Sequence, residues 1–95
     1  MTMQQTREMG MTHQDFFRGF PMVARGHRWR QDNDTVTLDT EEGSVSIHLG
    51  PQGERRIALL VLPVTHLTFT FSGYDRDAVD RFMARFDFAF RRGGG

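Results

Sequence analysis

The four histidines of the chain are the side chains best suited to bind a metal ion or to transfer a proton near neutral pH. They are His13, His27, His48 and His66. The last two lie on the polar faces of two alternating segments, so they would approach each other if those segments form neighbouring strands. Two imidazoles are too few for a catalytic zinc ion, which needs three protein ligands. We therefore expect no metal, and a small-ligand or enzyme site near His48 and His66 is the second alternative function.

The other patterns that could support catalysis or bind a cofactor fail at specific positions. Asp32 and Asp34 begin like a calcium-binding EF-hand loop, but Thr37 and Gly43 stand where that loop needs glycine and glutamate. No nucleophile elbow surrounds a serine, and the glycines form neither a GxGxxG motif nor a phosphate-binding loop. The chain has no cysteine, which excludes disulfides, thiol nucleophiles and thiolate metal sites. We assign no catalytic residue and expect no cofactor.

The densest basic stretch runs from Arg25 to Arg30 and has a tryptophan between arginines, as in proteins that bind single-stranded nucleic acid. Nucleic-acid binding through Arg28, Trp29 and Arg30 is therefore the first alternative function. Two observations weaken this hypothesis. Strand alternation would place the two arginines on the face opposite the tryptophan, and an acidic run without cations, residues 32–42, would lie beside them. An edge strand with solvated arginines and a core tryptophan is the competing interpretation.

Length and composition bound the class of protein. The chain has 95 residues, 38% of them hydrophobic, which fits one ordinary globular domain. Its 12 cations, all arginine, equal its 12 anions, so no global field attracts nucleic acid or an anionic membrane. The longest apolar run, residues 57–64, is far shorter than the ~18 residues of a membrane span, and the first ten residues lack an apolar signal segment. We expect a cytoplasmic protein without membrane insertion.

The predicted domain organisation is a flexible N-terminal arm over residues 1–11, a single α+β domain over residues 12–92 and a disordered tail over residues 93–95. The domain would begin with a short helix over about residues 13–18, because Thr12 and Asp15 resemble a capping pair. Gly19 and Pro21 are expected to end this helix.

Period-two alternation predicts about five strands in a mainly antiparallel sheet. The alternating segments and the turns between them give strands near residues 27–31, 35–39, 44–49, 56–62 and 66–71. The fourth of these segments is apolar on both faces, which predicts a strand at the centre of the sheet. Pro63 lacks a backbone donor and is expected to end that strand.

The clearest predicted element is a C-terminal amphipathic helix from about Asp75 to Arg92. Aspartates near its start and arginines near its end agree with the helix dipole. Its apolar stripe should pack on one face of the sheet. The stripe comprises Ala78, Val79, Phe82, Met83, Phe86, Ala89 and Phe90. The fold class is therefore α+β, with a short N-terminal helix and this second helix on one sheet face.

Phe88 lies outside that stripe, on another side of the predicted helix. Its own side also carries three arginines, Arg81, Arg85 and Arg92. An aromatic residue among arginines on an exposed helix is typical of a contact for a protein partner, although the N-terminal segment could instead fold over it. The sequence therefore predicts a small non-catalytic binding or adaptor module that self-associates as a homodimer, with these four residues as the partner-binding site.

Overall fold

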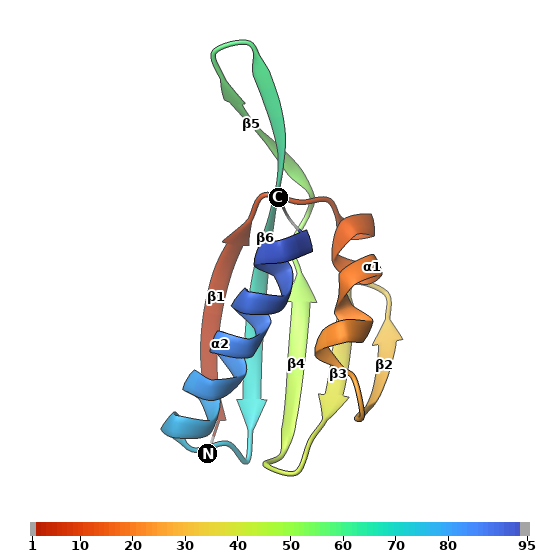
Figure 1. Cartoon of the computed structure of the whole chain (residues 1–95), viewed down its shortest axis with the longest axis vertical. Coiled ribbons are helices and arrows are strands. Elements are labelled where there is room, and N and C mark those ends of the chain that lie inside the picture. The colour runs from red at the N-terminus through yellow and green to blue at the C-terminus, as the bar shows by residue number, and fades with distance from the viewer. Residues whose placement is uncertain (1, 94–95) are drawn as a thin grey trace.

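The structure is a two-layer arrangement of one antiparallel sheet and two helices (Figure 1). The computed structural model describes residues 2–93 of the chain. Its elements follow one another in the order β1 (Thr2–Met9), α1 (His13–Val23), β2 (Arg28–Asp32), β3 (Thr35–Asp39), β4 (Ser44–Leu49), β5 (Gly53–Ile57), β6 (Leu60–Ser72) and α2 (Arg76–Gly93). The predicted fold class, α+β, is confirmed, with six strands instead of about five.

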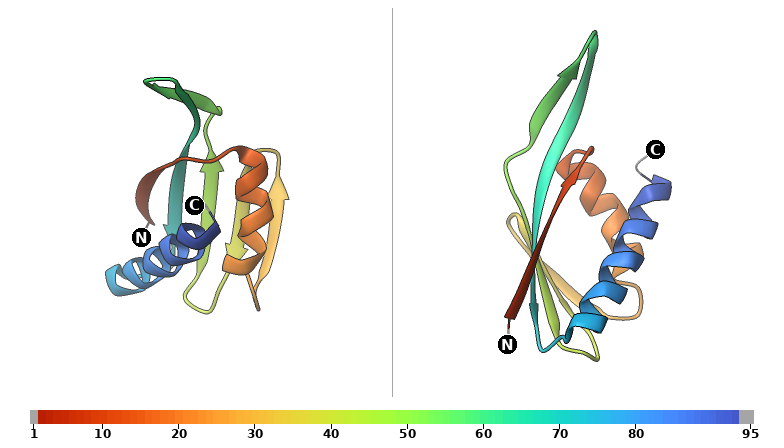
Figure 2. Two further views of the ribbon diagram at one scale, coloured as in Figure 1. Left: turned by 45° about the horizontal axis from the view of Figure 1, so that its top comes forward. Right: turned by 90° about the vertical axis from the view of Figure 1, so that its left-hand side faces the viewer.

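The strands pair in the order β1-β6-β4-β3-β2, and β5 pairs with the part of β6 that extends beyond this sheet. Both helices cover the same face, as Figure 2 shows in its right-hand view. The opposite face, called the open face below, is not covered by any element in the described part of the chain. Its side chains on β4 and β6 are mainly serine, threonine and histidine.

The core lies between the covered sheet face and the two helices. Alternate residues of β3, β4 and β6 point into it because successive side chains of a strand face opposite sides. These inward residues are Val36, Leu38, Val45, Ile47, Leu49, Leu67, Phe69 and Phe71, each at most 1% exposed. The buried hydroxyl of Thr65 donates a hydrogen bond of 2.8 Å to the Met11 carbonyl. Its burial therefore leaves no unsatisfied hydrogen-bonding group.

Helix α2 follows its sequence pattern closely. Asp75 caps it, because a carboxylate oxygen of Asp75 accepts the backbone N–H of Ala78 at 2.8 Å. The predicted stripe is buried or, at Ala89, partly buried against the core. Phe86 is fully buried, with its ring centroid 4.9 Å from that of Phe69 and 4.6 Å from that of Phe90. This helix therefore closes the core as its periodicity predicts.

The N-terminal segment differs from the flexible arm expected for residues 1–11. Its residues 2–9 form β1, which pairs with β6 along its whole length, from Thr2 opposite Ser72 to Met9 opposite Thr65. Arg7 on the covered face forms a two-bonded ion pair with Asp87 of α2 at 3.1 and 3.2 Å. The sequence of β1 does not show the apolar alternation typical of a strand, because its inward positions include a glutamine and this arginine as well as two methionines. Of the predicted tail, Gly93 ends α2 and the other two residues lie outside the described range.

Helix α1 also runs further than predicted, to Val23, with Pro21 inside it. The expected cap is present, since Thr12 and Asp15 form both bonds of a capping box. Gly19 does not end the helix. A Cβ atom there would lie 2.9 Å from the Phe90 ring, so glycine permits close packing of α1 on α2.

The segment predicted as a central strand, residues 56–62, occupies a different place. A two-residue turn at Ala58 and Leu59 divides it between β5 and β6, and every residue from Gly53 to Leu62 is exposed. Pro63 does not end a strand but lies within β6. The prediction of a central strand is wrong, because β1 and β4 reach only Thr65 and Leu67 of β6 and leave its first residues without a covering layer.

Replacing Phe86 with alanine should lower the free energy of unfolding by about 3–5 kcal/mol, since the substitution removes a fully buried aromatic ring. Phe88→Ala on the same helix is the matched control, because that side chain is 58% exposed and its loss should change stability by less than ~0.5 kcal/mol. Urea denaturation followed by circular dichroism measures both. Equal effects of the two substitutions would contradict the assignment of the core stripe.

Candidate functional site

The most unusual surface of the molecule is the protruding hairpin, defined as residues 53–64, which comprises β5 and the first residues of β6. It extends away from the layered body at the top of Figure 1. Its aliphatic side chains are exposed, by 51% at Ile57, 99% at Leu59, 60% at Leu60, 46% at Val61 and 41% at Leu62. Contiguous exposed apolar residues of this kind mark interaction sites on soluble proteins.

The two faces of the protruding hairpin differ in polarity. Ile57 is opposite Leu60, and Arg55 is opposite Leu62, so one face carries three aliphatic side chains and an arginine near its base. The other face carries Val61 opposite Arg56 and Pro63 opposite Glu54. The first face is therefore the more apolar of the two.

The outer edge of β5 has unpaired backbone groups. Residues that flank a two-residue turn form a hydrogen-bonded pair, and hydrogen-bonded pairs alternate with non-hydrogen-bonded pairs along the ladder. Counting from Ile57, the backbone groups of Arg56 and Glu54 must point away from β6. β5 pairs with no other strand among the described residues, so this edge is free. On the opposite edge, Pro63 has no N–H to point outward, so this edge is less able to pair with a further strand.

An ionic cluster on the open face holds the base of the protruding hairpin to β1. The Arg55 guanidinium donates to one carboxylate oxygen of Glu8, and His66 lies 3.1 Å from the other oxygen. The hydrogen bond from Arg55 is the main cause that holds the pKa of Glu8 below its ordinary value of 4.5. The charged form of Glu8 is therefore the form that fixes the hairpin base.

The Glu8 carboxylate should titrate below pH 4.5 in the folded protein. Because its pKa is lowered on folding, the stability that it supplies is present above pH 4.5 and is lost as the pH falls through the folded pKa. Arg55→Gln should return the titration toward 4.5, whereas Arg56→Gln, on the other face of β5, should leave it unchanged. A pH titration of the Glu8 side-chain carbon by NMR measures this, and identical curves for the two variants would refute the cluster.

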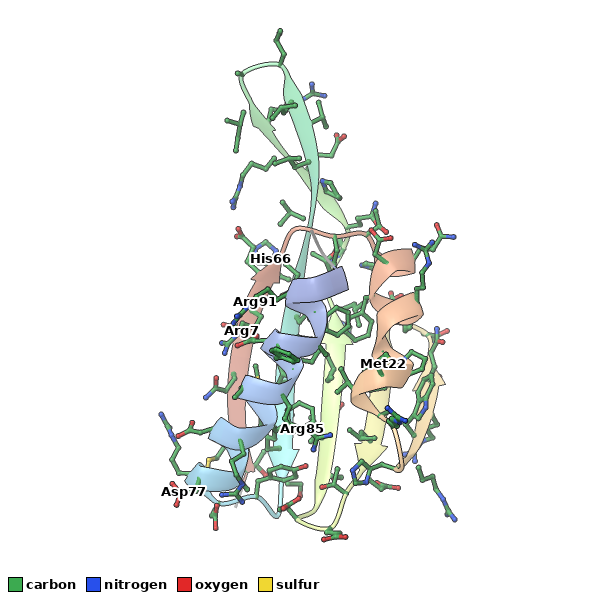
Figure 3. All side chains as sticks on the ribbon, viewed as in Figure 1. Arg7, Met22, His66, Asp77, Arg85 and Arg91 are labelled. Atoms are coloured by element: carbon green, nitrogen blue, oxygen red, sulfur yellow. The ribbon has the colours of Figure 1, made fainter. Side chains whose placement is uncertain are left out.

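The residues of the predicted partner site on α2 do not share one surface feature, because two of them line a cavity and Phe88 does not. Arg81 and Arg85 line a cavity of about 240 Å³ at the opposite end of the molecule from the protruding hairpin. Phe88 is 58% exposed, so the N-terminal segment does not cover it. Arg92 lies in α2, but its side chain is outside the described part of the structure. Figure 3 labels Arg85 on the lower half of α2.

That cavity also contains the single tyrosine of the chain. Tyr74 is 5% exposed, and its hydroxyl shares a hydrogen bond of 2.6 Å with the hydroxyl of Thr40. Burial raises the pKa of Tyr74 above its ordinary value of 10.0, and the bond to Thr40 offsets part of this rise. The charge of Glu42 raises the pKa further and the charge of Arg85 lowers it. The cavity thus brings together side chains from the β3–β4 loop and α2.

A spectrophotometric titration at 295 nm should give a Tyr74 midpoint above pH 10.0. Glu42→Gln should lower this midpoint and Arg85→Gln should raise it, because the two charges act with opposite sign. Folding stability should fall as the pH rises above 10.0, since the unfolded chain then loses a proton that the folded chain keeps. Shifts of the same sign in the two variants would contradict the geometry of the cavity.

The residues of the nucleic-acid hypothesis do not share a surface. Trp29 is half-buried on the covered face, with its ring 5.0 Å from that of Phe20 in an edge-to-face contact. Arg28 and Arg30 are exposed on the open face of the edge strand β2, where Arg28 is opposite Asp39. A base that stacked on Trp29 would therefore be on the wrong side of the sheet for these arginines.

His48 and His66 lie on the open face of neighbouring strands, at diagonal positions. His48 contacts the Thr35 hydroxyl at 3.1 Å, whereas His66 is turned toward Glu8. His66 lines a cavity together with Glu8 and Arg55, and His48 is not among the residues that line it. Among residues 2–93, no group of three or more metal-binding side chains occurs.

No family model, curated protein or solved structure matches the chain. Within residues 2–93, neither helix has the length and hydropathy needed to cross a membrane. The protruding hairpin and the cavity beside Tyr74 are the two surface features that bear on function. Sequence reasoning missed the protruding hairpin because its turn, Ala58-Leu59, contains none of the glycine, asparagine or aspartate residues that mark tight turns.

Proposed function

We propose that the protein is a small non-catalytic binding module that self-associates through its protruding hairpin. The observation that supports this proposal is the row of exposed aliphatic residues from Ile57 to Leu62 on an element that the rest of the chain leaves uncovered. The occupant of this surface is a second copy of the chain.

The exposed apolar surface of the hairpin is the largest apolar area available for self-association among the described residues. The five exposed residues together expose the equivalent of about three aliphatic side chains per copy. Complete burial of this surface on both copies would contribute at most about 9–18 kcal/mol, at ~1.5–3 kcal/mol per side chain, and the dimer buries only part of it, because Val61 is on the other face of the hairpin and Leu59 is in the turn. Association costs about 4–15 kcal/mol in lost freedom of motion. The isolated exposed residues Met22 and Phe88 offer much less surface.

The free edge of β5 is complementary to itself in charge. If two β5 strands pair antiparallel about a two-fold axis at Arg55, Glu54 is opposite the partner's Arg56 and Arg56 is opposite the partner's Glu54. The outward backbone groups of these residues then pair with each other. Arg55 meets the partner's Arg55, and in each copy Glu8 offsets that charge. The apolar faces of the two hairpins then lie on the same side of the joined sheet, so that their aliphatic side chains contact each other only beside the seam.

Size-exclusion chromatography with light scattering tests the proposal. The wild type should have the mass of two 11.0 kDa chains, and Leu60→Ser with Leu62→Ser should have the mass of one. Met22→Ser and Phe88→Ser are controls, because both residues are exposed apolar side chains outside the protruding hairpin. Both controls should remain dimeric.

Charge reversal tests the strand pairing itself. Glu54→Arg alone should weaken the dimer about tenfold or more, since it places like charges opposite each other. Glu54→Arg combined with Arg56→Glu should restore the dimer.

Three outcomes would overturn the proposal. The first is a monomeric wild type up to millimolar concentration. The second is dissociation by Phe88→Ser and not by the leucine substitutions, which would assign the interface to α2. The third is flotation with phosphatidylcholine vesicles that Leu59→Ser abolishes, together with a monomeric mass, which would make the hairpin a membrane contact.

A further inference from the structure

A second binding feature lies at the other end of the molecule, in the cavity beside Tyr74. We call it the cationic pocket. Its polar lining comprises Arg81 and Arg85 of α2 together with His27, Glu42 and the buried Tyr74. Its volume of about 240 Å³ lies below the ~300–1,000 Å³ of most ligand pockets, so only a very small molecule fits it. This feature is independent of the protruding hairpin and of self-association.

The two arginines of the cationic pocket have no carboxylate partner within 4 Å among the described residues, whereas Arg7, Arg55 and Arg76 each have one. Arg81 and Arg85 lie four residues apart on one helix face, where like charges repel each other and destabilise the helix. A bound anion removes this repulsion. Guanidinium groups bind carboxylates through two parallel hydrogen bonds, so a pair of arginines at one cavity fits such a ligand.

The floor of the cationic pocket is apolar. Leu38 is 1% exposed, Ala78 4% and Phe82 7%, and all three line the cavity. An anion with a compact apolar body therefore fits better than a fully hydrated inorganic ion. The negative charge of Glu42 in the lining repels a second negative charge on the ligand. These features favour a monoanion over a dianion such as phosphate.

Two backbone segments that approach each other closely restrain part of the lining. A Cβ atom on Gly43 would lie 2.0 Å from the Ser72 carbonyl oxygen, and Gly73 adopts a positive φ of 85° beside the Glu42 backbone. Only glycine permits this approach. This close approach restrains Glu42, which precedes Gly43, and Tyr74, which follows Gly73, and a restrained lining reduces the ordering cost of binding a ligand.

We propose that the cationic pocket binds a small organic monocarboxylate, with its carboxylate between Arg81 and Arg85 and its apolar body against Phe82. The ligand class follows from the paired guanidinium groups, the apolar floor and the acidic side chain of Glu42.

Titration with sodium benzoate as the probe tests this proposal by NMR. The signals of the Arg81 and Arg85 Nε–H groups and of the Tyr74 ring should shift with saturation. Arg81→Gln and Arg85→Gln should each weaken benzoate binding about tenfold or more. Arg91→Gln is the matched control, because Arg91 is an exposed arginine of the same helix that does not line the pocket, and it should bind as the wild type does.

A gain of function provides a second, independent readout. Inorganic phosphate should bind the wild type more weakly than benzoate does, and Glu42→Gln should strengthen phosphate binding. Shifts that grow linearly without saturation would overturn the proposal. So would equal weakening by Arg91→Gln, or phosphate binding that exceeds benzoate binding in the wild type.

Discussion

Strand β6 is the element on which the rest of the structure depends, because its thirteen residues pair with three other strands. Its second half pairs with β1 and β4 and buries Leu67, Phe69 and Phe71 beneath α2. Its first half extends beyond both neighbours and pairs with β5 alone among the described strands. A shift of one residue would turn the phenylalanines to the open face. The register that builds the core therefore also fixes which residues are left exposed in the protruding hairpin.

The two surfaces for which we propose binding lie at opposite ends of this strand. The protruding hairpin contains the start of β6 at Leu60, and the cationic pocket adjoins the turn that follows Ser72, along a molecule whose longest extent is 45 Å (Figure 1). This separation lets each feature be occupied without contact with the other. In a dimer joined through β5, both pockets remain open to solvent, so each copy would offer a ligand site of its own.

The arginines of the chain have different roles that depend on whether a carboxylate is within reach. Arg7 joins β1 to α2 through Asp87, and Arg55 joins the hairpin base to Glu8. Arg81 and Arg85 have no such partner among the described residues and instead line a cavity. The same type of cation therefore forms a structural ion pair at one position and the lining of a cavity, where we propose that it binds a ligand, at another.

The sequence by itself determined the elements whose signals are local. The stripe and cap of α2, the capping box at Thr12 and the hairpin of β2 and β3 depend on spacing and turn chemistry within a few residues. Only the tertiary structure decided that the apolar run around Val61 is exposed, because its burial depends on where the neighbouring strands end. It also decided β1, whose inward Arg7 is satisfied by a residue 80 positions away, and the convergence of Arg85 with Tyr74. Such contacts arise from chain packing, and no local period in the sequence encodes them.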